Sequence, residues 1–460
     1  MSDYQLLVIG AGPGGYTAAL RAAKLGLHTA IVERREVGGT CLNRGCIPTK
    51  TLLHASQVYH DAANGASVGV HGALTYDMGE MFAFKRSVSE KLRGGILSLL
   101  KSAKVDVLEG TAQITAPGQV SVTGADGTRT AYTAERILAA TGSVNVRPPI
   151  PGLELPGVMT SDELLEGTDT PYASIVIIGG GVIGVEFATF YSHLGCRVTL
   201  VEGMANLLPQ LDRELGQNLA QILKKQGVEV LTSAMVRSLE QTGEGLCVHL
   251  EQKGKELTVT GEKVLCAIGR RAYFDGLFAP DLNPALNGKR LLVDEDYRTS
   301  IPGVYAIGDA SAAVQLAHVA AAQGTDCVER MCGGKGSTDL NVIPSCIYSA
   351  PEIAVVGLTE AEARERGIPA VSGKCTLFSN ARTIIEDPGR CFMKLVARTD
   401  THALIGAQLM CQHASDMISQ LSTAMVNRLT VEQLLTVMRP HPSFEEALGE
   451  AVENLASKLA

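Results

Sequence analysis

One pattern of residues occurs twice in this chain and restricts its fold more than any other feature. In the first copy, the apolar stretch Tyr4 to Ile9 leads into a glycine-rich turn at residues 10–15, and an alanine-rich segment at 16–25 follows. A second apolar stretch at 28–32 then ends in Glu33. Short apolar runs predict buried strands and the alanine-rich segment predicts a helix, so this order predicts a βαβ unit with parallel strands.

The second copy has the same order of features. Its apolar run at 174–178 precedes a glycine-rich turn at 179–184, a helical segment at 185–194, a strand at 197–201 and Glu202. The first glycine of such a turn permits the tight bend, the second lets the backbone approach a pyrophosphate, and the third lets the helix pack on the strand. The chain is therefore predicted to bind two dinucleotides. The glycines concerned are Gly10, Gly12, Gly14 and Gly15 in the first copy, and Gly179, Gly181 and Gly184 in the second.

The acidic residue that ends each copy indicates which nucleotide binds there. Glu33 and Glu202 are predicted to accept hydrogen bonds from a ribose diol. A 2′-phosphate would meet the like charge of Glu202, and residues 203–206 supply no arginine to bind it. The second site is therefore predicted to prefer NAD over NADP. A single motif of this kind also fits a glycine turn in any α/β fold, but two complete copies disfavour that alternative.

Composition and charge exclude several classes of protein. A chain of 460 residues is long enough for about three domains of roughly 150 residues each. A net charge of −8 and an aromatic content of 4% without tryptophan argue against a nucleic-acid partner. No apolar run approaches the ~20 residues of a membrane span, and the first residues lack the basic start of a signal peptide. Eleven scattered cysteines are not typical of a secreted framework, so we expect a cytoplasmic protein with no membrane partner.

Two cysteines follow the first acidic residue closely. Cys41 and Cys46 can form a small-ring disulfide only where the backbone departs from a regular helix, because positions i and i+5 lie too far apart on one. Asn43, Gly45 and Pro48 supply that irregularity, and a helix after Pro48 would direct its N-terminus at Cys46 and lower the pKa of that thiol. A zinc site would need more nearby Cys or His residues than the single histidine present, so we expect no metal site.

The other cysteines are interpreted as structural. Cys327 and Cys332 have the same spacing as the first pair, but they lie in a continuous helical segment and are interpreted as ordinary helix thiols. The remaining seven cysteines are expected to be small buried hydrophobic residues.

One histidine differs from the rest in its surroundings. His441 lies between Pro440 and Pro442, which fix the backbone on both sides, and two carboxylates follow it. Two alternatives remain open from the spacing: a surface or capping residue, or a base for a thiol whose tautomer a carboxylate fixes. For the other nine histidines we expect surface or capping roles.

The glycine-rich pattern ends near Pro344. Strands are predicted at 353–356 and 392–396 and helices at 415–426 and 431–438, which together indicate a separate α+β domain. Further strand-like runs lie at 137–140, 264–268 and 304–307.

Taken together, these residues resemble the pyridine nucleotide-disulfide oxidoreductase family over residues 5–453, and within it the dihydrolipoamide dehydrogenase branch. The segment GTCLNRGCIPTK at 39–50 is similar to the family's redox-disulfide signature. Leu316-Ala317-His318 resembles the lipoamide branch, and His441 with Glu446 five residues later matches the family's catalytic His–Glu dyad.

The resemblance implies roles for individual positions. Cys41 and Cys46 would be the redox-active pair, Lys50 and Glu186 an ion pair beside the flavin ring, and Asp309 the partner of the ribityl chain. The FAD site would contain Gly10, Gly12, Gly14, Gly15, Glu33, Gly39, Thr40, Lys50, Ala112, Thr141, Gly142, Ser143, Asp309 and Ala317, and the NAD site Gly179, Gly181, Gly184, Glu186, Glu202 and Gly269.

The resemblance also implies a fold, an assembly and an activity. The α/β fold would comprise two Rossmann-like domains, for FAD (1–145) and NAD (146–268), a central domain (269–340) that completes the FAD site, and an α+β dimerisation domain (341–460). In the implied homodimer, His441 of one chain faces the cysteine pair of the other. The implied activity is oxidation of dihydrolipoyl groups with reduction of NAD⁺, and the implied partner is the lipoyl-bearing domain of a 2-oxoacid dehydrogenase or glycine-cleavage complex.

Some positions depart from the family pattern. Pro440 and Ser443 replace the usual Ala and Thr, and Ala272-Tyr273 replaces Pro-Asn, which affects the expected loop geometry. Two alternatives remain: a related NAD(P)H-dependent reductase of low-molecular-weight disulfides, or a non-catalytic flavin-binding scaffold. Glu202 disfavours glutathione reductase, and the absence of a vicinal cysteine pair at residues 456–460 disfavours mercuric reductase.

Overall fold

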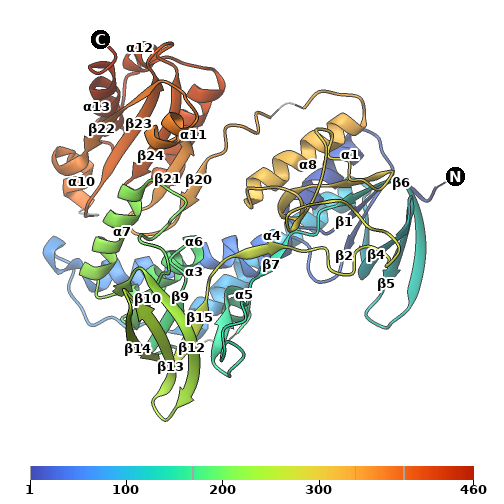
Figure 1. Ribbon diagram of the computed structural model, residues 1–460, viewed down its shortest axis with the longest axis horizontal. Helices are drawn as coiled ribbons and strands as arrows, with labels where there is room; N and C mark the ends of the chain where they lie inside the picture. Colours follow the sequence, from blue (N-terminus) through green and yellow to red (C-terminus); the bar gives the residue numbers. More distant parts are fainter. Residues whose placement is uncertain (1, 168–169, 337, 387–388) are drawn as a thin grey trace.

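The two glycine-rich copies each open a parallel β-sheet in this computed structural model, which describes residues 2–167, 170–336, 338–386 and 389–460 (Figure 1). The first sheet has the order β3-β2-β1-β6, and β19 pairs with the far side of β6. The predicted strand at 4–9 is confirmed at both ends. The elements of this unit are β1 (Tyr4–Ile9), α1 (Pro13–Lys24), β2 (Thr29–Glu33), β3 (Asp106–Glu109), β6 (Arg129–Ala139), β19 (Val304–Ala306) and α8 (Ala317–Met331).

The alternation of β1 side chains explains how both faces of this sheet are covered. Leu6 and Val8 pack against α1 and α8, whereas Leu7 and Ile9 face an antiparallel meander. Parallel strands that are buried on both faces are mostly apolar, and β1 is apolar except for Gln5. The meander comprises β4 (Thr111–Ala116), β5 (Gln119–Thr123) and the first half of β6.

The second sheet repeats this plan with the parallel order β11-β10-β9-β15-β8. An antiparallel meander again covers one of its faces. The elements are β8 (Val158–Thr160), α5 (Ser161–Glu166), β9 (Ser174–Ile178), α6 (Val182–His193), β10 (Arg197–Val201), α7 (Arg213–Lys225), β11 (Glu229–Leu231), β12 (Ala234–Thr242), β13 (Gly245–Gln252), β14 (Lys255–Gly261) and β15 (Lys263–Cys266).

Short elements connect the two units. Figure 1 shows α3 and α4, drawn in blue, reaching from the first unit toward the second, where α3 packs against α6. None of the described helices combines the length and the apolar character needed to cross a bilayer. The connecting elements are α2 (Gly39–Arg44), α3 (Cys46–Ala63), η1 (Gly65–Val68), α4 (Met78–Ser102), β7 (Ser143–Asn145), β16 (Arg270–Ala272), β17 (Leu286–Asn287), β18 (Arg290–Leu291) and η2 (Gly308–Ala310).

The C-terminal domain is an antiparallel sheet of order β20-β21-β24-β23-β22 with helices packed on it (Figure 1). This confirms the predicted α+β domain. The predicted helix at 431–438 is too long, because α12 ends at Leu435 with Thr436 as its C-cap. The elements are β20 (Ser345–Ile347), β21 (Ile353–Gly357), α9 (Glu360–Glu365), β22 (Ala370–Thr376), η3 (Leu377–Ser379), α10 (Ala381–Glu386), β23 (Phe392–Arg398), β24 (Leu404–Met410), α11 (Ala414–Val426), α12 (Val431–Leu435) and α13 (Glu445–Ala456).

Two expectations about buried residues need correction. Of the seven cysteines expected in the core, Cys196, Cys247 and Cys346 are only partly buried. His193 is buried rather than superficial, because α3 packs over α6 and stacks the ring of His60 on it with a centroid distance of 4.3 Å.

Candidate active site

A single large cavity of about 1710 Å³ brings the two glycine-rich turns and the first cysteine pair together. Its walls come from both parallel sheets, from α2 and α3, and from β20 of the C-terminal domain. All the predicted site residues line it except Gly15, Gly184, His441 and Glu446, within the part of the chain that the structure describes.

The turn glycines have no room for a side chain. Gly10 and Gly179 have φ angles of +99° and +111°, and a Cβ on either would lie 2.4 Å from a carbonyl oxygen on the neighbouring strand. A Cβ on Gly15 or on Gly184 would lie 1.8 Å from the carbonyl oxygen of the first glycine of its own turn. Bends of this tightness require glycine, and the two copies meet the requirement in the same way.

The middle glycine of each turn opens toward the cavity. Gly12 and Gly181 are the N-cap residues of α1 and α6, and neither makes a side-chain cap. A Cβ on Gly181 would meet nothing within 4 Å, and one on Gly12 would meet only Gly39 Cα at 3.9 Å. The first backbone N–H groups of two 12-residue helices are therefore available to an anion in the cavity.

The two acidic residues make the same contacts in both units. Glu33 accepts hydrogen bonds from the backbone N–H groups of Ala11, at 2.8 Å, and Arg35, at 2.9 Å. Glu202 accepts hydrogen bonds from Gly180 and Met204, both at 2.7 Å. The partners lie 22 residues before and two residues after the glutamate in each copy, so the carboxylates are fixed beside their glycine turns.

The cysteine pair sits where two helices meet. Cys41 lies in α2, and α3 begins at Cys46 itself rather than after Pro48, so Pro48 occupies the first turn, where no helical N–H is needed. The backbone breaks at Gly45, with φ −146° and ψ −116°, and a Cβ there would lie 2.9 Å from the carbonyl oxygen of Thr40. This one glycine therefore lets the two thiols approach each other. Cys41 and Cys46 are free thiols in this structure.

The two thiols differ strongly in acidity. A hydrogen bond from Cys41, followed by the positive charge of Lys50, lowers the pKa of Cys46 to about 7, although burial acts in the opposite direction. The same hydrogen bond and burial raise the pKa of Cys41 well above its usual value. The pair therefore loses its first proton from Cys46, whose thiolate lies at the N-terminus of α3.

The ion pair implied by the resemblance is present. Lys50 Nζ lies 2.9 and 2.8 Å from the two carboxylate oxygens of Glu186, which is buried. The backbone N–H of Tyr348 donates to the same carboxylate at 3.1 Å.

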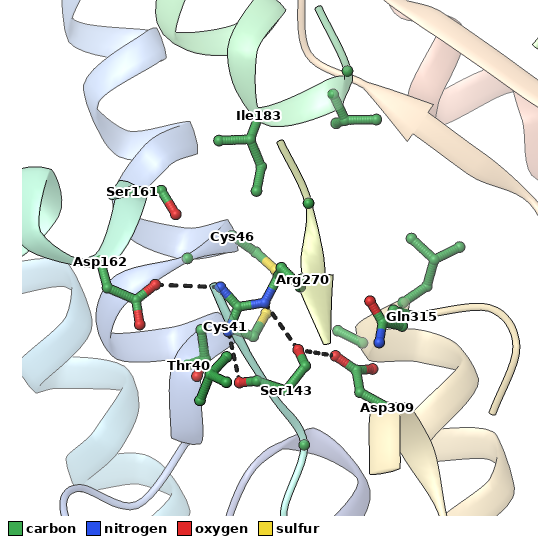
Figure 2. A pocket seen from close by; sticks show the side chains of 18 of the residues that line it. Thr40, Cys41, Cys46, Ser143, Ser161, Asp162, Ile183, Arg270, Asp309 and Gln315 are labelled. Atoms are coloured by element: carbon green, nitrogen blue, oxygen red, sulfur yellow. Dashed lines mark hydrogen bonds and ion pairs between the residues drawn. The ribbon is translucent and has the colours of Figure 1, made fainter. Parts of the chain in front are cut away.

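A polar network in the cavity wall includes a residue that the sequence analysis did not assign. Figure 2 shows Arg270 between Asp162 and Ser143, with Asp309 beyond Ser143. Ser143 Oγ donates to Asp309 at 2.6 Å, and Arg270 Nε donates to Ser143 Oγ at 2.9 Å. Burial raises the pKa of Asp309. Arg270 directly follows the predicted site residue Gly269, which was the only signal for it.

Tyr273 is a second residue that the sequence analysis missed. Its ring lies 4.3 Å from the Arg34 guanidinium, its hydroxyl accepts a hydrogen bond from Arg34 at 2.6 Å, and Thr141 Oγ donates to its carbonyl oxygen. Ala272-Tyr273 stands where the family pattern has Pro-Asn, and here the cation–π contact between Tyr273 and Arg34 holds the loop.

Comparisons with known proteins agree with this geometry. The model of the pyridine nucleotide-disulphide oxidoreductase family matches residues 4–324, and that of its dimerisation domain matches residues 343–452. The chain belongs to this family. It is 36% identical to a dihydrolipoyl dehydrogenase of Bacillus subtilis (98% of this chain, 97% of the relative) and to one of Thermus scotoductus (99% and 98%).

Two solved structures of the family are similar over nearly their whole length. LpdA from Mycobacterium tuberculosis has a TM-score of 0.89 at 27% identity, covering 98% of this chain and 99% of that one. The HOCl-induced flavoprotein disulfide reductase RclA from Escherichia coli has a TM-score of 0.86 at 29% identity, covering 99% of both chains.

The residues present fit the family's cofactors, which are FAD and a pyridine nucleotide. The open side of Gly12 and the helix N-terminus behind it suit the first pyrophosphate, and Gly181 provides the same setting for the second. The carboxylate of Asp309, which is partly buried in the cavity wall, provides acceptors for hydroxyl groups of a bound flavin chain.

The His–Glu pair of the oxidoreductase lies in the dimerisation domain, outside the cavity lining of its own chain as far as the structure describes it. His441 Nδ1 lies 2.8 Å from Glu446, and the backbone N–H of Ser443 donates to the same carboxylate at 3.0 Å. These two hydrogen bonds lower the pKa of Glu446. His441 is 76% exposed, so its Nε2 is available to another molecule.

Proposed function

We propose that this oxidoreductase is a cytoplasmic dihydrolipoyl dehydrogenase that oxidises protein-bound dihydrolipoyl groups and reduces NAD⁺. The observation that carries the proposal is the position of the Cys41–Cys46 pair in a cavity that also contains both dinucleotide turns, and the lowered pKa of Cys46 supports it. A thiolate at neutral pH between two nucleotide sites suits the passage of two electrons from a dithiol.

Each cysteine takes a separate role in the proposed reaction. His441 of the partner subunit removes a proton from one substrate thiol, and the resulting thiolate attacks Cys41 of an oxidised Cys41–Cys46 disulfide. The bond to Cys46 breaks, and Cys46 leaves as the thiolate because a thiol of lower pKa is the better leaving group.

The second substrate thiol then attacks the mixed disulfide and breaks its bond to Cys41, and the proton of that thiol passes to the released Cys41 sulfur, while the partner's His441 keeps the first proton and later returns it to solvent. The substrate leaves as a cyclic disulfide and Cys46 remains a thiolate beside Lys50. FAD, when bound, accepts the two electrons and delivers them to NAD⁺. Glu446 fixes the tautomer of His441 by accepting its Nδ1 proton in a hydrogen bond.

The proposed partners follow from the same residues. We propose a homodimer through the dimerisation domain, and a lipoyl-bearing domain of a 2-oxoacid dehydrogenase or glycine-cleavage complex as the source of the dithiol. NAD is preferred over NADP because Glu202, held by two backbone N–H groups, would repel a 2′-phosphate.

The test compares substrates with the purified, FAD-loaded protein. We expect NADH-dependent reduction of lipoamide to exceed reduction of glutathione disulfide, and NADH to exceed NADPH as the donor. A Cys46→Ser variant should lose lipoamide turnover while it retains FAD. A higher kcat/KM for a low-molecular-weight disulfide would overturn the substrate assignment, and flavin binding without turnover of any disulfide would indicate a non-catalytic scaffold.

A second candidate is a reductase of other disulfides, favoured by the similarity to RclA. In that case NADH oxidation should proceed with a small disulfide and should not respond to lipoamide. The cavity residues would be the same, so the substrate comparison separates the two candidates.

A further inference from the structure

We propose that the β12–β13 hairpin of the NAD-binding unit holds a Zn²⁺ site formed by Glu240, Cys247 and His249. Each residue supplies one ligand atom, and these atoms all lie within 4.8 Å of one another. Among the residues that the structure describes, it is the only group of three or more His, Cys, Asp or Glu side chains close enough to hold a metal ion. None of the three lines the cavity of the active site.

Strand pairing brings the three residues together. In the antiparallel register of β12 and β13, Glu240 lies directly opposite Cys247. His249 follows Cys247 by two residues, so both side chains project from the same face of β13. The intervening residues Val248 and Leu250 are buried in the core, which places the three ligands on the outer face.

The spacing suits a metal ion of tetrahedral preference. Zinc binds sulfur, nitrogen and oxygen at about 2.0–2.3 Å, so tetrahedral ligand atoms lie about 3.3–3.8 Å apart. His249 Nε2 and Glu240 Oε1 are already 3.1 Å apart. The strand pairing holds the backbone, so the ligand atoms, now within 4.8 Å of one another, would close around an ion by side-chain rotation.

The ligand types select the ion. One thiolate, one imidazole and one carboxylate suit Zn²⁺, whereas Mg²⁺ and Ca²⁺ require mainly oxygen ligands. Binding would release the thiol proton of Cys247 to solvent, and the thiolate and Glu240 would then balance the charge of the ion. On the same two strands, Arg237 and Glu251 form a salt bridge of 2.6 Å and neutralise each other. Water would complete the coordination.

The sequence analysis predicted no metal site because it considered only ligands that lie close together along the chain. Glu240 and Cys247 are brought together only by the hairpin, and a Cys-x-His sequence on a strand matches no familiar zinc spacing.

The test is a zinc titration of the FAD-loaded protein after chelator treatment, under reducing conditions and in competition with a chromogenic chelator. Cys247→Ser, His249→Gln and Glu240→Gln should each weaken one binding event by about tenfold or more. The matched controls are Cys332→Ser, which removes an exposed thiol elsewhere, and His402→Gln, which removes another histidine beside a glutamate. These controls should bind Zn²⁺ as the wild type does.

The cavity thiols are the same in every variant, so the difference between variants reports on the hairpin alone. With Co²⁺ in place of zinc, the wild type and Cys332→Ser should show thiolate-to-cobalt absorption that Cys247→Ser lacks. Zinc binding of equal affinity in Cys247→Ser and Cys332→Ser, or a wild type that binds no ion at the hairpin, overturns the proposal. Flavin content and circular dichroism check that each variant is folded.

Discussion

Lys50 Nζ donates to both carboxylate oxygens of Glu186, at 2.9 and 2.8 Å, and this contact joins the two nucleotide-binding units. Lys50 comes from α3, one turn after Cys46, and Glu186 comes from α6 behind the second glycine turn. Because Tyr348 of the C-terminal domain donates to the same carboxylate, three parts of the chain meet at Glu186. The side chain of Glu186 is only 3% exposed, so its charge depends on these partners.

Replacing Lys50 with methionine should destabilise the protein. A buried carboxylate that loses its partner costs about 3–5 kcal/mol, and the partial exposure of Lys50, 30%, reduces the expected loss to about 2 kcal/mol. Chemical denaturation of the FAD-loaded protein measures the loss. Because removing the charge of Glu186 removes the need for a partner, Lys50→Met/Glu186→Gln should recover part of the stability. A double variant less stable than Lys50→Met would contradict this account.

The hydrogen bond between the two thiols should control the acidity of Cys46. In the reduced protein, Cys41→Ala removes the donor, so the pKa of Cys46 should rise from about 7 toward its usual value near 9. Cys41→Ser keeps a hydroxyl donor and should retain most of the depression. The measurement is the pH dependence of Cys46 alkylation, which follows the thiolate fraction.

The direction of the pH effect follows from that pKa. Above pH 7, Cys46 is mainly a thiolate and reacts rapidly; as the pH falls through 7 the thiolate is protonated and alkylation slows. In Cys41→Ala the same decline should occur nearer pH 9. A decline that stays near pH 7 in Cys41→Ala would show that Lys50 and the helix N-terminus, rather than the Cys41 thiol, set the acidity.

Glu202→Gln should weaken the proposed preference for NADH. The amide removes the charge that repels a 2′-phosphate, and it places an NH₂ group toward one of the two backbone donors that now bind the carboxylate. Hydrogen bonds to charged groups contribute about 1.5–3 kcal/mol, so the ratio of kcat/KM for NADH over NADPH should fall by about tenfold or more.

The internal repeat supplies a matched control. Glu33→Gln makes the equivalent change in the first unit, where the carboxylate has the same two kinds of partner. It should weaken retention of FAD and leave the ratio of NADH to NADPH unchanged. An equal change of that ratio in both variants would mean that Glu202 acts through general destabilisation.

The features of the fold that could be predicted from the sequence are those that depend on local stereochemistry, namely the tight turns and the buried strands. Gly10 and Gly179 reveal tight turns because no other residue tolerates their φ angles, and the strands before them are buried on both faces and therefore apolar. The start of α3 was misplaced because the break depends on Gly45 alone, and Pro48 is tolerated in a first helical turn.

Contacts between distant segments could not be predicted in this way. Arg270 reaches Ser143 and Asp162 only after β16 pairs with β7, and Glu240 reaches Cys247 only through hairpin register. Lys50 and Glu186 were an exception, because the family resemblance supplied that pair. Local patterns thus predict the elements, whereas pairing of strands decides which polar side chains meet.

The placement of the His–Glu pair gives the sharpest test of the assembly. His441 lies outside the cavity lining of its own described chain, and we propose that it serves the cysteines of the partner subunit. His441→Gln should lose at least 99% of lipoamide turnover, because general acid–base catalysis contributes about 10²–10⁴-fold, and Cys46→Ser should lose turnover altogether, because it cannot form the disulfide. Two differently tagged chains carrying one change each allow the heterodimer to be purified.

If each active site is shared between subunits, one of the two active sites of the heterodimer contains both substitutions and the other contains neither. The purified heterodimer should therefore show about half the turnover of a wild-type dimer, although both parent homodimers are inactive. Were His441 to act on the cysteines of its own chain, each site would contain one fault and the heterodimer would be as inactive as its parents. Turnover per FAD of the heterodimer, measured before the subunits exchange, distinguishes the two arrangements.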